Sequence, residues 1–97
     1  IEINSNLDRI RVPERGSPSN YRWKANTWHT IKARIDVADD GSGMVRAKAW
    51  PRDDAEPEGW TLEFKHDNAH KSGSPGLFGF SPQMPVYIDN VKVTPNE

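Results

Sequence analysis

Apolar and polar residues alternate along several segments of this chain, and the cleanest alternation runs from residue 28 to residue 37. A period of two places successive side chains on opposite faces of a β-strand, so this segment predicts a half-buried strand. No segment keeps the apolar stripe that an amphipathic helix needs. We therefore expect a nearly all-β protein. On the predicted strand, one face carries Ile31, Ala33, Ile35 and Val37, and the other carries Thr30, Lys32, Arg34 and Asp36.

Two further strands are predicted downstream of this segment. Residues 39–43 contain two glycines and two aspartates, the composition of a tight hairpin turn. Beyond the turn, Val45, Ala47 and Ala49 continue the apolar face up to the loop at residues 51–59. Residues 60–65 alternate again and predict a third strand before a long polar connection at residues 67–75.

The two ends of the chain also contain strand patterns. Residues 7–12 predict a first strand, with Ile10 and Val12 on one side. Near the other end, apolar residues occupy even positions up to Ile88 and odd positions from Val91 onward. A β-bulge near residues 89–90 produces such a change of face, so we expect a bulged terminal strand over residues 86–93.

Composition limits the class of protein. The chain has 97 residues, enough for one domain at most, and no cysteine, so disulfide and zinc-thiolate stabilisation are excluded. A formal net charge of −1 gives no long-range field that attracts nucleic acid or an anionic membrane, and no apolar run predicts membrane insertion. Because Ile1 begins inside a strand-like pattern, we expect residues 1–97 to be a single domain or one part of a longer or processed protein.

The order of motifs resembles the C-terminal portion of the concanavalin A-like, or laminin G-like, jelly-roll family. The resemblance covers residues 28–94. It implies an antiparallel β-sandwich that is incomplete here, with its missing strands supplied by another chain or a preceding segment, because an unpaired edge promotes aggregation. It also implies a secreted or cell-surface protein. The matching motifs are the Trp-initiated strand at 28–34, the strand with Lys48-Ala49-Trp50, the loop Glu56-Pro57-Glu58-Gly59-Trp60, a Gly-x-x-Gly-Leu strand at 73–77 and the terminal strand with Asp89-Asn90-Val91-Lys92-Val93.

A carbohydrate site is predicted on the outward face. Aromatic rings cover the apolar patches of sugars, while planar cationic side chains bind hydroxyl pairs or acidic groups. An alternative interpretation is structural: Trp50 covers the sheet edge against Pro57 and Trp60, and the basic side chains either lie solvated or pair with Glu63 and Asp36. Trp23 and Trp28 are interpreted as core or strand-pairing residues. The candidate ligand-binding residues are Arg34, Arg46, Lys48, Trp50 and Trp60.

A structural calcium ion is implied by the family resemblance, with Asp89 as one ligand. Calcium takes six to eight oxygens, so the other ligands would come from outside this chain. The alternative is that the Asp89 carboxylate accepts hydrogen bonds from backbone N–H groups at the bulge. His66 and His70 are four residues apart, a spacing that suits zinc on a helix, but their segment is predicted to be a loop without a third ligand.

No catalytic motif is present. The chain lacks the Glu-x-Asp-x-x-Glu carboxylate set of laminarinase-type enzymes, the Gly-x-Ser-x-Gly elbow and a phosphate-binding loop. We therefore expect a non-catalytic, lectin-like module that binds carbohydrate or polysaccharide. The alternative is a structural or assembly subunit, or a processed fragment, whose sheet is completed by another polypeptide. An accessory segment of a polysaccharide hydrolase or lyase is a third hypothesis.

Overall fold

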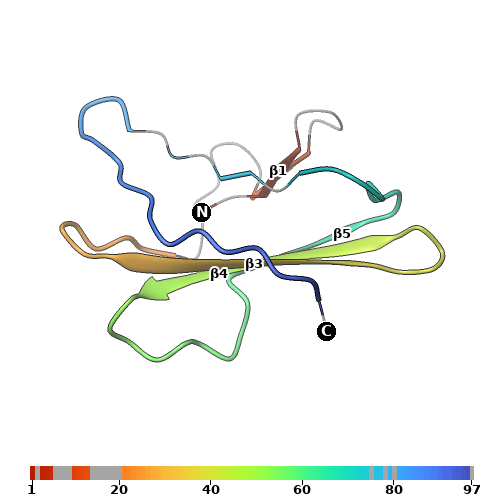
Figure 1. Ribbon diagram of the computed structural model, residues 1–97, viewed down its shortest axis with the longest axis horizontal. Coiled ribbons are helices and arrows are strands. Elements are labelled where there is room, and N and C mark those ends of the chain that lie inside the picture. Colours follow the sequence, from red (N-terminus) through yellow and green to blue (C-terminus); the bar gives the residue numbers. More distant parts are fainter. Residues whose placement is uncertain are drawn as a thin grey trace.

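The computed structural model describes residues 1, 3–5, 10–13, 21–74, 76–77, 79 and 81–96. These residues form two antiparallel sheets and no helix, so none of them belongs to a helix that is long and apolar enough to cross a membrane (Figure 1). The nearly all-β prediction is confirmed. One sheet pairs β1 with β2, and the other has the order β3-β4-β5. The strands are β1 (Ile3–Ser5), β2 (Ile10–Val12), β3 (His29–Val37), β4 (Gly43–Pro51) and β5 (Leu62–His66).

The hairpin between β3 and β4 forms where the sequence predicts it. The Ala38 N–H donates to the Ser42 carbonyl at 2.8 Å, which closes the turn. Gly41 has a φ of +87°, a conformation that favours glycine. Gly43 is required for a different reason, because a Cβ at this position would lie 2.6 Å from the Cβ of Ala69.

The strand register puts the apolar residues on one face and the polar residues on the other. Ile35 lies opposite Val45, and Val45 lies opposite Phe64, so one apolar row crosses all three strands. On the other face, Arg46 lies opposite Glu63. We call these the apolar face and the polar face of the sheet. The alternation predicted from the sequence is confirmed.

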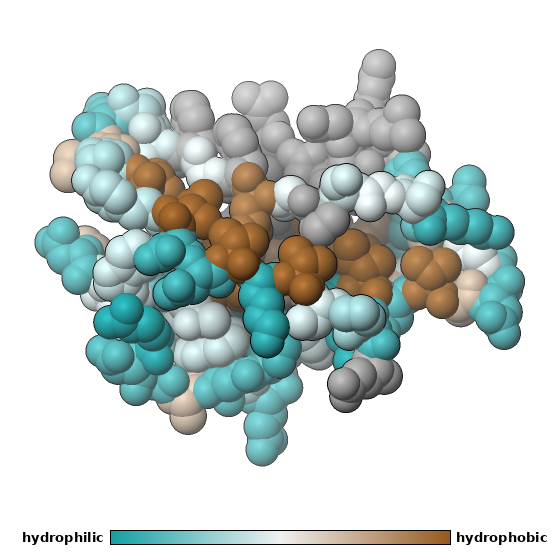
Figure 2. All heavy atoms as spheres, viewed as in Figure 1, coloured by the Kyte–Doolittle hydropathy of each residue, from teal (hydrophilic) through white to brown (hydrophobic). Residues whose placement is uncertain are grey.

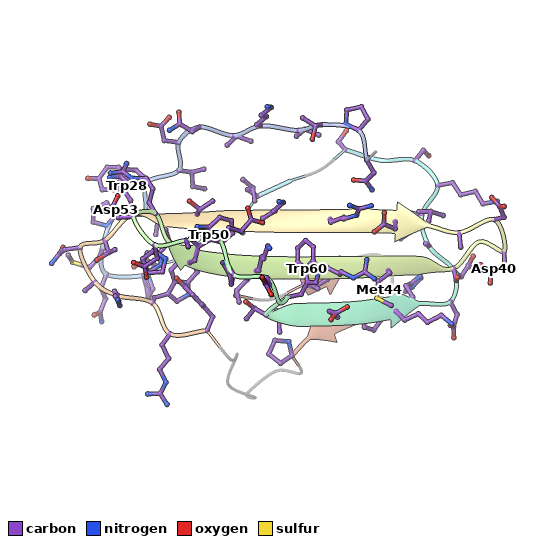
Figure 3. The ribbon with its side chains drawn as sticks, turned by 90° about the horizontal axis from the view of Figure 1, so that it is seen from below. Trp28, Asp40, Met44, Trp50, Asp53 and Trp60 are labelled. Carbon is purple, nitrogen blue, oxygen red and sulfur yellow. The ribbon has the colours of Figure 1, made fainter. Side chains whose placement is uncertain are left out.

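The apolar face is covered over β4 and β5 but open over β3. Ala47, Ala49 and Leu62 are buried, whereas Ile35 is 56% exposed and its neighbours Ile31 and Val37 are also about half exposed. The β1–β2 pair lies on the apolar side of the sheet, opposite the loop that follows β4 (Figures 1 and 3). No large side chain among the described residues is fully buried. The hydrophobic core is therefore thin and one-sided.

The overall dimensions agree with an incompletely covered sheet. The total accessible surface is 8429 Å² for an 11.0 kDa chain, whereas a compact folded monomer of that mass exposes about 5,600 Å². The radius of gyration is 14.3 Å, compared with about 12.5 Å for a compact domain of this length. The excess surface includes the apolar face at β3.

Two strand predictions need correction. The predicted terminal strand at 86–93 is not a strand, because none of the strands in the described part of the chain pairs with its backbone groups. Asn90 nevertheless has a φ of +56°, where the change of face was expected. The predicted Gly-x-x-Gly-Leu strand at 73–77 is likewise not a strand at its described residues. Of the predicted first strand, Ile10–Val12 forms β2, while its earlier part, before residue 10, lies outside the described residues.

Candidate functional site

Lys48 lies at the centre of the polar face and is only 5% exposed. The loop after β4 folds back over this face, as Figure 3 shows from the loop side. Its backbone and side chains enclose the ammonium group: Lys48 Nζ donates to the Pro57 carbonyl at 2.6 Å and lies 2.7 Å from Glu56 Oε1. A buried ammonium needs such partners, because an unpaired charge in the interior is strongly disfavoured.

Trp50 and Trp60 both lie close to the same ammonium group. Lys48 Nζ is 4.9 Å from the ring centroid of Trp60 and 5.8 Å from that of Trp50, within the range of cation–π attraction. Three of the five predicted ligand-binding residues are therefore brought together. They form an internal cluster in which the cation already has its partners.

The other two candidates, Arg34 and Arg46, are held in an ion-pair network. Arg34 binds both carboxylate oxygens of Asp36, with Nε to Oδ2 at 2.8 Å. Arg46 links Asp36 to Glu63, with two bonds of 3.0 Å. These are the pairs named by the structural interpretation of the sequence. Because the guanidinium groups already bind carboxylates, fewer donors face an external ligand.

The carboxylates of the polar face are stabilised in their charged form. Hydrogen bonds from Arg34 are the main cause that lowers the pKa of Asp36. For Glu56, hydrogen bonds from Lys32 and then Lys48 lower the pKa. The face is therefore a network of mutually neutralising charges. Exposed ion pairs of this kind contribute little stability individually, but those of Glu56 with Lys32 and Lys48 link the loop to the sheet.

A second candidate site is a hollow of about 580 Å³ beside the start of β3. Trp28 is half exposed and Tyr87 is 73% exposed, so two aromatic residues distant in sequence contribute to one surface. Sequence reasoning did not find this hollow, because Tyr87 was assigned to a paired strand. Its lining residues are Asn26, Thr27, Trp28, Met84, Pro85 and Tyr87.

The core assignment of Trp23 and Trp28 is wrong, since both side chains are about half exposed. Trp23 instead packs edge-on against Tyr21, at 4.8 Å between ring centroids, and against His29, at 4.7 Å. The backbone of Trp28 does extend the β3–β4 ladder, because its carbonyl accepts a hydrogen bond from the Arg52 N–H at 2.9 Å. Strand pairing therefore holds for Trp28, but core packing does not.

The described residues alone do not supply a metal site. Nowhere in the described part of the chain do three His, Cys, Asp or Glu side chains gather as a metal centre requires. At the predicted calcium position, Asp89 Oδ1 accepts a hydrogen bond from the Asn90 N–H at 2.8 Å, the backbone contact that the sequence offered as the alternative. The rings of His66 and His70 are stacked, with centroids 6.3 Å apart.

Comparison with models of known protein families, with curated proteins and with solved structures found no match. The resemblance to concanavalin A-like domains therefore depends on the motifs alone.

Proposed function

We propose that this chain is a non-catalytic module that contributes one sheet to a larger β-sandwich of jelly-roll type. Its apolar face is covered by a second β-layer from another polypeptide segment, as in the assembly hypothesis. The observation that supports this proposal is a contrast in burial between the two faces. Ile35 is exposed although the alternation of its strand places it on the face that should be buried, whereas Lys48 on the opposite face is buried.

The free energy available from a second layer is substantial. Full burial of an isoleucine or valine side chain stabilises by roughly 1.5–3 kcal/mol, so covering a half-exposed one gains on the order of 1 kcal/mol. Three isoleucine or valine side chains of β3 are about half exposed: Ile31, Ile35 and Val37. Sheets that pack face to face bury such rows between them at a separation of roughly 10 Å.

A fluorescent probe of exposed apolar surface, anilinonaphthalene sulfonate, tests this proposal in the isolated chain. We expect the probe to bind the native chain and its emission to fall severalfold in the double variant Ile31→Ser/Ile35→Ser. The matched control, Thr30→Ser/Lys32→Ser, alters the polar face of the same strand and should leave the emission unchanged. Circular dichroism checks that both variants keep their sheets. Equal emission from both variants would contradict the proposal.

Carbohydrate binding is the second candidate, and the aromatic hollow favours it. Half-exposed Trp28 and exposed Tyr87 offer ring faces for stacking on a sugar, and Asn26 and Thr27 add polar groups at the same surface. By contrast, the cations of the predicted polar-face site are already paired. In this hypothesis the module acts in a secreted or cell-surface protein, as the resemblance implies.

Electrophoresis through gels containing a neutral polysaccharide such as laminarin distinguishes the two sugar sites. If the hollow binds sugar, the chain is retarded, and Trp28→Ala/Tyr87→Ala removes the retardation. If the predicted face binds sugar, Arg46→Ala/Trp50→Ala removes it instead. A chain that migrates equally with and without polysaccharide would exclude both sites for this ligand.

A further inference from the structure

The hydrogen-bond pattern of the β3–β4 pair determines which backbone groups reach the outer edge of β3. In an antiparallel pair, residues alternate between those that bond their partner strand and those that point away. The Ala38–Ser42 and Trp28–Arg52 bonds show that even-numbered residues of β3 face β4. The outward N–H and C=O groups therefore belong to the five odd-numbered residues, of which the last four also carry apolar side chains: His29, Ile31, Ala33, Ile35 and Val37.

One contact confirms that the odd-numbered residues of β3 point their backbone groups away from β4. The side chain of Asn96 donates through Nδ2 to the Ile35 carbonyl and also lies 3.2 Å from Asp36 Oδ1. Among the described residues, this is the hydrogen bond found at the outer edge of β3, and no strand pairs there. The C-terminal segment, residues 86–96, runs alongside β3 without joining the sheet (Figure 1).

The other edge of the same sheet is protected against strand pairing. By the same rule, the outward backbone groups of β5 belong to Glu63 and Lys65, because the even-numbered residues face β4. Charged side chains and a short strand are the features by which proteins block edge pairing. β5 has five residues and a charged side chain at both of these positions, whereas β3 has nine residues and apolar side chains at its outward positions from Ile31 to Val37.

We infer that the outer edge of β3 is a strand-addition site, which takes one extended polypeptide strand from the second layer. This inference depends on the proposed function and names how its partner engages the sheet. The added strand hydrogen-bonds to the outward groups of β3 and places alternate apolar side chains beside Ile35. Figure 2 shows a row of hydrophobic side chains, interrupted by polar ones, on the side of the molecule where the C-terminal segment and β3 lie. Exposed members of this region include Ile31, Ile35, Val37, Val86, Ile88, Val91 and Val93.

A second copy of this chain fits the edge less well than a different strand. Two copies paired through β3 are related by a two-fold axis perpendicular to the sheet, so their apolar faces lie on the same side. That arrangement doubles the area of the open apolar face and leaves Ile31 and Ile35 uncovered. A strand that continues into a second layer hydrogen-bonds to the outward backbone groups of β3, and the layer that it belongs to covers the apolar face.

Amide hydrogen exchange measured by NMR tests the edge directly. In the isolated chain, the N–H groups of Ile31, Ala33 and Val37 should exchange at least about tenfold faster than those of Lys32 and Arg34, which bond β4. A soluble probe peptide as long as β3, with alternating threonine and valine between terminal lysines, should then slow the outward amides by about tenfold or more.

The variant Ala33→Pro blocks the edge without breaking the sheet. Proline removes the outward N–H of residue 33, whereas all β3–β4 hydrogen bonds come from even-numbered residues. In Ala33→Pro, we expect the amides that bond β4 to stay protected from exchange, but the probe peptide should no longer slow the outward amides. The control Ala33→Thr keeps the N–H and should show both the protection and the slowing by the peptide. Lys32→Pro removes an inward donor and should unfold the hairpin.

Three outcomes would overturn the inference: slow outward amides in the isolated chain, a probe peptide that leaves them unchanged, or an undiminished peptide effect in Ala33→Pro. If the chain dimerises with protection of the same amides, a second copy occupies the edge and the inference is again wrong. The fluorescence experiment on Ile31→Ser/Ile35→Ser reports the face alone. The inference of a strand-addition site can therefore be contradicted while the proposal of a second layer remains supported.

Discussion

The two faces of the β3-β4-β5 sheet have opposite relations between residue type and burial. On the polar face, Lys48 is almost completely enclosed, although lysine is among the residues that are rarely buried. On the apolar face, Ile35 keeps more than half of its surface exposed. Hydrophobicity determines which face needs cover, but burial also depends on which segment of chain reaches that face.

Chain connectivity explains the difference. The loop after β4 returns directly across the polar face, where Glu56 and Pro57 bind the Lys48 ammonium and Trp60 packs beside it. None of the described segments covers the apolar face at β3 in this way. Its cover is complete only around Ala47 and Leu62. The polar face is therefore closed by local sequence, whereas the apolar face requires a partner.

The largest expected effect comes from reversing the charge of Lys48, which is enclosed at the centre of the polar face. Lys48→Glu puts a carboxylate beside Glu56 and the Pro57 carbonyl, in place of the buried ammonium group that binds both. We expect a loss of at least about 3 kcal/mol in the free energy of unfolding, measured by urea denaturation. The control Lys65→Glu reverses an exposed charge on the same face and should cost less than about 1 kcal/mol. Equal losses would show that the polar face is open.

The next prediction compares two positions on the apolar face. Leu62→Ala removes a buried side chain and should destabilise the chain by about 2–3 kcal/mol. Ile35→Ala removes a side chain of similar size from the open part and should cost less than about 1 kcal/mol. Both values come from the same denaturation experiment. An Ile35→Ala loss as large as that of Leu62→Ala would mean that β3 is already covered.

The smallest effect concerns pH. Because hydrogen bonds from Lys32 and Lys48 lower the pKa of Glu56 in the folded chain, the unfolded chain takes up its proton first as the pH falls. The stabilisation is complete above the ordinary glutamate pKa of 4.5 and is lost as the pH falls below it. Glu56→Gln should therefore flatten the acid side of the stability profile. A variant with the same acid slope as the native chain would contradict this role.

The alternation of residues allowed the β3-β4 hairpin, the two faces and β5 to be predicted, because strand period and turn chemistry are local properties. The terminal strand at 86–93 was wrong for the opposite reason. Its alternation was correct for a strand, but strand formation also requires a neighbour, and none of the described strands pairs with it.

The predicted site was recovered only in part. The parity of Lys48 and Trp50 placed them correctly on one face, yet parity does not reveal that Glu56 and Pro57 fold back to bind the lysine. The hollow at Trp28 and Tyr87 was missed because it joins a loop to a segment far away in sequence. Such contacts depend on tertiary packing rather than on residue period.

Thiol labelling most directly tests the claim that the apolar face is open at β3. The chain has no cysteine, so Ile35→Cys and Ala47→Cys each introduce a single thiol on that face, and Lys65→Cys provides an exposed reference. With a maleimide reagent, we predict that Ile35→Cys reacts within about threefold of the reference and Ala47→Cys at least about a hundredfold more slowly. Ile35→Cys reacting as slowly as Ala47→Cys would contradict the account.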